Sequence, residues 1–136
     1  MPKIKKPDYT YALGRRKSAS ARVRLFKGKG ENMVNGEPIE KYFPGDIFKD
    51  AWTKPFKLTD SIEKYFVTVN VRGGGKNGQL EATSLGISRA LAALDRDKFR
   101  FSLKKAGLLS RDSRIRERRK VGMGGKSRRQ KQSPKR

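Results

Sequence analysis

The stretch that decides the fold is residues 73–94, which read GGGKNGQLEATSLGISRALAAL. A helix is predicted over residues 80–94, because large and small residues recur there at helical spacing on opposite faces. The face of large residues, with one serine, consists of Leu80, Ser84, Ile87, Leu91 and Leu94. The small face consists of Ala82, Gly86, Ala90 and Ala93. We expect this helix to be buried on both sides and to let a second backbone approach its small face closely.

The glycines before this helix have two interpretations. Gly73, Gly75 and Gly78 have the spacing of the dinucleotide-binding fingerprint, and they lie between a strand-like run at residues 65–71 and the helix. Alternatively, they turn a sharp corner where φ must be positive. The fingerprint also needs a second strand that ends in an acidic residue about 20 residues later. A basic helix is predicted there instead, which favours the turn.

The same stretch resembles the signature of the ribosomal small-subunit protein nine family. Between residues 73 and 91 the chain has three glycines, a Gly-Gln pair, and then Gly86-Ile87-Ser88-Arg89-Ala90-Leu91. The resemblance implies a structural protein of the small ribosomal subunit, located in the cytoplasm. It also implies the fold of the second domain of ribosomal protein five, with a left-handed β-α-β connection.

Composition limits the classes of protein that this chain can belong to. The 136 residues suffice for one domain with a modest core, and they carry a net charge of +22. Such a charge implies a polyanionic partner. Cysteine and histidine are both absent, which excludes disulfides, thiolate metal sites and histidine catalysis. We therefore expect a non-enzymatic protein with no metal, no cofactor, no small-molecule substrate and no membrane span.

The charge is concentrated at the two ends of the chain. Residues 1–30 have a net charge of +9 and residues 101–136 a net charge of +12, whereas residues 31–70 have a net charge of −2. We expect a flexible basic arm at residues 1–8, a globular domain at residues 9–109, and an extended RNA-binding tail at residues 110–136. From residue 110 onward no segment has an apolar face, so this tail cannot bury enough surface to fold alone.

Periodicity predicts a single α+β domain, with a mostly antiparallel sheet and helices on one face. Strands are predicted at residues 9–14, 19–26 and 65–71, the last one central because both its faces are largely apolar. Asn35-Gly36 predicts a type I′ hairpin turn. A short helix with Ile47, Phe48, Ala51 and Trp52 on its apolar face is expected to begin at an Asp46 cap and to stop before Pro55. A last helix is expected after an Asp97 cap, with Gly107 as its stop.

Clusters of cations mark the expected nucleic-acid contacts. Gly14-Arg15-Arg16-Lys17 resembles the opening motif of the same ribosomal family, and the density of arginine after residue 110 suits phosphate, which the guanidinium binds bidentately. For Arg22 and Arg24 a solvated outer strand face is a good alternative. The predicted contacts to ribosomal RNA are Arg15, Arg16, Lys17, Arg22, Arg24, Gly74, Lys76, Arg89, Arg111, Arg114, Arg118, Arg119, Lys120, Lys126, Arg128 and Arg129.

The end of the tail also resembles the family, with one departure. In the family the last residues contact the transfer RNA in the peptidyl site, and Lys135 and Arg136 match that ending. Where the family has proline, an aromatic residue and serine, this chain has Lys131, Ser133 and Pro134. The resemblance therefore implies transfer-RNA binding by Lys135 and Arg136. Neighbouring head proteins of the subunit, namely proteins seven, ten and fourteen, are the expected protein partners.

Two other classes of function are left to distinguish. One is an enzyme that binds a dinucleotide at the glycine loop, which titration with a nicotinamide cofactor would test. The other is a general DNA-compacting protein, which would bind duplex DNA as tightly as structured RNA.

Overall fold

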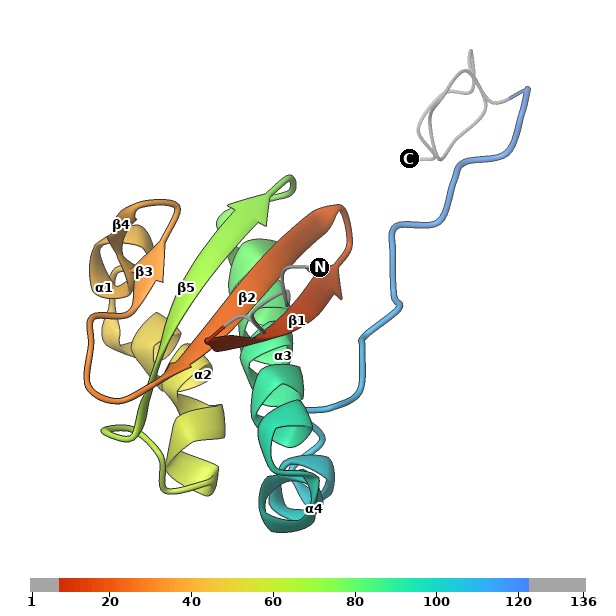
Figure 1. Ribbon diagram of the computed structural model, residues 1–136. Helices are drawn as coiled ribbons and strands as arrows, with labels where there is room; N and C mark the ends of the chain where they lie inside the picture. Colours follow the sequence, from red (N-terminus) through yellow and green to blue (C-terminus); the bar gives the residue numbers. More distant parts are fainter. Residues whose placement is uncertain (1–7, 123–136) are drawn as a thin grey trace, which may run out of the picture.

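The computed structural model describes residues 8–122 and confirms a single α+β domain with one sheet. Figure 1 shows the sheet with the two longest helices, α2 and α3, behind it, so one face of the sheet is covered. Within the described residues, no helix is both long and apolar enough to cross a membrane. The elements in chain order are β1 (Tyr9–Arg16), β2 (Ala19–Lys27), β3 (Met33–Val34), β4 (Glu37–Pro38), α1 (Ile39–Tyr42), α2 (Asp46–Leu58), β5 (Tyr65–Arg72), α3 (Lys76–Leu94) and α4 (Arg96–Lys105).

The sheet is mostly antiparallel, as predicted. Its strand order is β1-β2-β5-β3-β4, and three of its pairings are antiparallel. The exception is β3, which pairs in parallel with β5 after a connection through α1 and α2. β5 is therefore central, but only Val67, Val69 and Val71 on one side of it are buried. The predicted central position of this strand is confirmed, although Asn70 and Arg72 on its other side are exposed.

Small residues set the distance between α3 and the sheet. The buried side of β1 carries Ala12 and Gly14, not its large residues. A Cβ atom on Gly14 would lie 1.8 Å from the carbonyl oxygen of Ala82, and one on Gly86 would lie 2.5 Å from Cγ2 of Val23. The close backbone approach predicted for the small face of α3 is therefore confirmed, although Ala93 at its end is exposed.

Two turns help to hold the sheet and α3 in register. One joins β3 to β4, and the other joins β5 to α3. Asn35 and Gly36 have φ of 51° and 82°, which confirms the predicted hairpin turn. The Asn35 side chain accepts a hydrogen bond from the Val71 backbone N–H at 2.8 Å and donates one to the Val71 carbonyl at 3.0 Å. Gly73 and Gly74 also have positive φ, at 77° and 66°, which confirms the turn interpretation of the glycine run. In residues 8–122 no strand follows α3, so the second half of a dinucleotide-binding unit is missing there.

Helix boundaries differ from prediction in three places. α3 begins at Lys76, before the predicted start at residue 80, because the glycine loop already leads into the first turn. α2 begins after Gly45 with no side-chain cap from Asp46, and it continues through Pro55 to Leu58. Its apolar face is also shifted, since Trp52 is buried whereas Ile47 is 84% exposed.

The cap of α4 lies two residues earlier than predicted. Asp95, not Asp97, caps this helix, because its carboxylate accepts a hydrogen bond from the Lys98 backbone N–H at 3.2 Å. The predicted stop is confirmed, since Gly107 follows the helix with a φ of 75°. Phe99 and Leu103 are the buried residues of α4 and attach it to the core.

Candidate nucleic-acid interface

Most of the predicted RNA-contacting side chains that the structure describes are exposed, and they lie in two regions. The first region is the end of the β1–β2 hairpin and the outer face of β2, with Arg15, Lys17, Arg22 and Arg24. The alternation along β2 places its arginines opposite the buried residues of the same strand. The second region is the tail after α4. Its exposed basic residues are Arg111, Arg114, Arg116, Arg118, Arg119 and Lys120.

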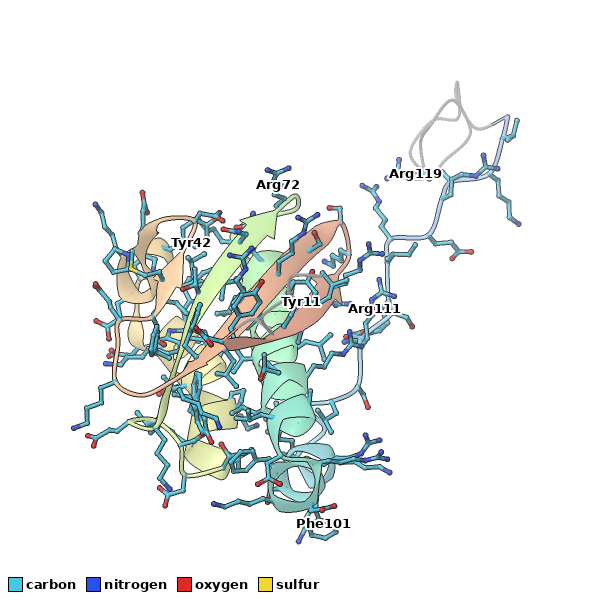
Figure 2. The ribbon with its side chains drawn as sticks, viewed as in Figure 1. Tyr11, Tyr42, Arg72, Phe101, Arg111 and Arg119 are labelled. Carbon is cyan, nitrogen blue, oxygen red and sulfur yellow. The ribbon has the colours of Figure 1, made fainter. Side chains whose placement is uncertain are left out.

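The tail leaves the domain as an extended segment. Residues 111–120 contain neither helix nor strand, as predicted, and Figure 1 shows them running away from the sheet and helices. Figure 2 shows the side chains of Arg111 and Arg119 along this segment. Ile115 and Val121 are 69% and 85% exposed, so the apolar residues here contribute nothing to the core.

Arg16, a predicted RNA contact, has partners within the protein and anchors the start of the tail. Its guanidinium donates to the carboxylate of Glu81 on α3 and to the carbonyl oxygen of Arg114 at 2.8 Å. It also lies 3.1 Å from a carboxylate oxygen of Asp112. Only 11% of the Arg16 side chain is exposed. We call Arg16, Glu81, Asp112 and Arg114 the tail clamp.

Within the tail clamp, Asp112 and Arg114 form a bidentate ion pair. The Arg114 Nε and Nη2 atoms donate to the two carboxylate oxygens at 3.0 and 2.7 Å, and the Arg114 backbone N–H donates to one of them at 3.0 Å. The side-chain hydrogen bond from Arg114 is the main reason that the pKa of Asp112 lies below its ordinary value. The same carboxylate raises the pKa of Arg114. Both groups are therefore charged at neutral pH.

Two other predicted contacts also have partners inside the protein. The Lys76 ammonium lies 3.4 Å from the centre of the Tyr42 ring and donates to the Tyr42 carbonyl at 3.1 Å. Arg89 donates to the Leu13 carbonyl at 2.9 Å. These bonds fix the side chains in place, and each cation has further donors that a phosphate can use.

The glycine loop forms a shallow hollow at the start of α3. The hollow has a volume of about 290 Å³ and is lined by the loop together with Arg16, Lys17 and Ser18. Gly74, a predicted RNA contact, is one of its lining residues, and its positive φ excludes most side chains there. A nucleic-acid backbone can therefore approach the main chain closely at this point.

Three arginines line another hollow. Two of them were not among the predicted RNA contacts, and the third, Arg89, was predicted but not grouped with them. Arg89 on α3 and Arg96 and Arg100 on α4 surround a space of about 370 Å³, together with Ala92, Ala93 and Leu109. No acidic residue lines it. The spacing of four between Arg96 and Arg100 could have shown that they share a face of α4. Their convergence with Arg89 depends on how α4 packs against α3, which the sequence does not reveal.

The remaining predicted contacts belong to the end of the chain. Residues 123–136 lie outside the described part of the chain, and with them the predicted RNA contacts Lys126, Arg128 and Arg129 and the predicted transfer-RNA contacts Lys135 and Arg136. Among residues 8–122 no group of three or more acidic, histidine or cysteine residues could hold a metal ion.

Comparison with known proteins identifies the family of this chain. The family model described as ribosomal protein S9/S16 matches residues 14–136. A small ribosomal subunit protein uS9 from Maridesulfovibrio salexigens is 48% identical over 118 residues, which are 87% of this chain and 90% of that protein. The protein of the same name from Solidesulfovibrio magneticus is 50% identical over 118 residues, with the same two coverages.

A third relative extends the match to a longer protein. The small ribosomal subunit protein uS9 of Leifsonia xyli subsp. xyli is 47% identical over 112 residues, which are 82% of this chain and 67% of that protein. The family match covers most of the chain and includes the tail as well as the domain. This chain therefore belongs to the ribosomal protein S9/S16 family, whose members are structural, non-enzymatic constituents of the small ribosomal subunit in the cytoplasm.

Proposed function

We propose that this chain binds ribosomal RNA in the head of the small subunit, and that the end of its tail contacts the transfer RNA in the peptidyl site during translation. The observation that carries the proposal is the exposed basic segment at residues 111–120, which leaves the domain without helix or strand. Arginine and lysine there can reach between RNA helices, whose A-form grooves are recognised mainly through shape and backbone.

Electrostatics supplies most of the affinity in this proposal. Each phosphate contact releases condensed counterions, so a chain with a net charge of +22 gains affinity from many contacts together. Arginine binds phosphate with two parallel hydrogen bonds, so the binding depends on the orientation of the guanidinium as well as on its charge. The exposed arginines of β2 and the tail serve this role, whereas Arg16 serves it indirectly by holding the tail.

The proposal divides the chain into parts. The globular domain at residues 9–109 binds the head RNA and its neighbouring proteins seven, ten and fourteen, and residues 110–136 extend toward the transfer RNA, with Lys135 and Arg136 at the contact. The fold is that of the second domain of ribosomal protein five, with a left-handed β-α-β connection. The parallel pairing of β3 with β5 around α2 supports this assignment.

Reconstitution into small subunits tests the proposal. The variant Arg116→Gln/Arg118→Gln removes two exposed tail charges, and Lys104→Gln/Lys105→Gln removes two exposed charges from the last turn of α4 as a matched control. We expect the tail variant to wash off subunits at lower salt than the control, with a salt slope lower by about one per lost phosphate contact. Equal retention of both variants would contradict a role for the tail in RNA binding.

A competition assay tests the DNA-compacting alternative. At fixed salt, structured ribosomal RNA and duplex DNA of the same length compete for the full chain. We expect the RNA to bind more tightly, since the proposed sites fit folded RNA. Equal affinity for both competitors would favour a general DNA-compacting protein.

A further inference from the structure

The face of the sheet that the helices leave uncovered has its own chemistry. α2 and α3 lie against the other face, and Figure 2 shows Tyr11 in front of β1 and β2 on the uncovered side, with Arg72 at the end of β5. The strand register aligns four rows of residues across β1, β2 and β5 on this face. The rows are Tyr9, Phe26 and Phe66; Tyr11, Arg24 and Thr68; Leu13, Arg22 and Asn70; and Arg15, Ser20 and Arg72.

This face is divided between an aromatic end and a cationic end. At the aromatic end, the Phe26 and Phe66 rings stack with centroids 5.1 Å apart, and Tyr9 lies 5.6 Å from Phe26. The Arg24 guanidinium lies over the Tyr9 ring at 5.1 Å. At the other end are Arg15, Arg22 and Arg72, and the rows contain no aspartate or glutamate. We call these rows the aromatic-arginine face.

The exposure of Tyr11 is the feature of this face that packing within the protein does not explain. Tyr11 is 51% exposed, although tyrosine has a large apolar ring. It lies on β1, which is an edge strand, so a ligand can approach it from the side of the sheet. Arg24 is its partner across the strands, and Arg22 belongs to the next row. An aromatic ring flanked by arginines is the arrangement that binds a base through its face and a phosphate through its charge.

We propose that the aromatic-arginine face binds an unpaired segment of RNA, with one base stacked on Tyr11 and the adjoining phosphates held by Arg22, Arg24 and Arg72. The inference rests on the RNA binding proposed above and adds a second mode to it, since stacking needs a base that is free of a helix. Stacking on tyrosine tolerates any base, because every base has a π face.

Charge favours RNA over protein occupants of this face. Four arginines without an acidic neighbour in the rows repel a second copy of this chain, which carries the same face and a net charge of +22. A protein partner would need an acidic surface to match these arginines. RNA supplies both the negative charge and the flat rings.

The experiment uses the full chain, with its tyrosine rings isotopically labelled, and two probes of equal charge. One probe is a twelve-nucleotide oligoadenylate, and the other is an abasic ribose-phosphate chain of the same length. The chain has four tyrosines, so each ring signal can be assigned by a Tyr→Phe variant. We expect oligoadenylate to shift the Tyr11 ring protons upfield through the ring current of a stacked adenine. The abasic probe should leave them in place.

Affinity measurements give the second readout. Tyr11→Leu should weaken oligoadenylate binding about tenfold and leave binding of the abasic probe unchanged, because a stacked base contributes that much to binding. Tyr11→Phe should bind as the wild type does. Phe101→Leu is the matched control, since Phe101 on α4 is 75% exposed, lies in a basic helix and belongs to no such face.

Three results would overturn the inference. In the first, the chain binds oligoadenylate but the Tyr11 ring signal does not shift. This result would contradict stacking on Tyr11 and leave the proposed function intact. Another is an equal loss of affinity for both probes in Tyr11→Leu. The third is self-association of the chain that protects the Tyr11 ring, which would make the face an interface between two copies.

Discussion

At Gly14, the absence of a Cβ atom decides how closely α3 can lie against the edge strand of the sheet. A Cβ atom on this residue would meet the Ala82 carbonyl oxygen first, at 1.8 Å, and that oxygen belongs to backbone and cannot rotate away. The sequence showed the small face of α3 but not its counterpart on β1. A single glycine in an alternating strand gives no sign of which helix passes over it.

Gly14→Ala should therefore destabilise the protein, whereas Gly78→Ala should stabilise it. A methyl group on Gly14 forces β1 and α3 apart and should cost about 3 kcal/mol of unfolding free energy. A Cβ atom on Gly78, within α3, would meet its nearest atoms at 3.6 and 3.8 Å, so the gain in helix propensity should be about 0.5–1 kcal/mol. Urea unfolding of both variants measures this. A Gly14→Ala protein as stable as the wild type would show that α3 does not touch β1.

The Asp112 carboxylate gives the tail clamp a defined dependence on pH. Its pKa is lowered in the folded protein, chiefly by the Arg114 side-chain hydrogen bond, so the clamp is fully present above the ordinary aspartate pKa of about 3.9. It is lost as the pH falls through the lowered pKa. The Arg114 amide signal should thus stay constant from pH 7 to about pH 4 and change only below it. In the Arg114→Gln variant, used as the control, the guanidinium hydrogen bond is removed, so the pKa of Asp112 should lie closer to the ordinary value of about 3.9. A midpoint near 4 in the wild-type chain as well would mean that the clamp does not form.

At the scale of elements, α2 shows how tertiary contacts override a local rule. Proline has no backbone N–H, so the Ala51 carbonyl lacks its usual helical donor at Pro55. The Ser84 hydroxyl on α3 donates to that carbonyl at 3.3 Å. The sequence predicted that the helix would stop before Pro55. This prediction was wrong because the substitute donor comes from another helix, which a single chain segment does not show.

A double-mutant cycle tests this contact between α2 and α3. Ser84→Ala should cost about 1 kcal/mol of unfolding free energy, because it leaves the part-buried Ala51 carbonyl without this donor. In a Pro55→Ala background the helix supplies its own donor, so the same Ser84→Ala change should cost much less. Thermal or urea unfolding of the four proteins gives the coupling. Equal costs in both backgrounds would contradict the role assigned to Ser84.

The tail clamp is a set of contacts that the sequence did not reveal. Three adjacent cations at residues 15–17 predicted RNA contacts, but the strand alternation turns the Arg16 side chain toward α3, where Glu81 and the start of the tail meet it. The carboxylates of Glu81 and Asp112 were visible in the sequence. Their convergence on Arg16 could not be seen in the sequence, because Glu81 lies 65 positions and Asp112 lies 96 positions further along the chain.

Arg16→Met should release the start of the tail while leaving the domain folded. Methionine keeps an apolar stem but donates no hydrogen bond to Glu81 or to the Arg114 carbonyl. Amide order parameters of residues 111–114 should fall to below about 0.6, the range of flexible backbone. Arg15→Met is the control, since Arg15 is exposed and its replacement should leave these values unchanged. Rigid tail amides in Arg16→Met would show that something other than Arg16 holds the segment.

At the scale of the whole molecule, charge is unevenly divided along the chain. Residues 31–70 have a net charge of −2 and supply the buried Phe43, Trp52 and Phe56, whereas residues 101–136 have a net charge of +12. The distribution of charge predicted this division, periodicity predicted the α+β class, and the Asn35-Gly36 pair predicted the hairpin, because each depends on local pattern. The hollow of Arg89, Arg96 and Arg100 and the aromatic-arginine face could not be predicted, because both depend on how elements come together in space.

The dissociation rate of transfer RNA from the peptidyl site tests the central proposal most directly. Small subunits are reconstituted with the full chain or with a chain that ends at residue 134 and so lacks Lys135 and Arg136. The truncated chain should assemble as well as the full one, because the rest of the tail keeps the basic residues that are proposed to bind ribosomal RNA. We predict faster dissociation at low salt, equivalent to a loss on the order of 1–3 kcal/mol, with a smaller difference at high salt. Identical dissociation rates at low salt would contradict the proposal.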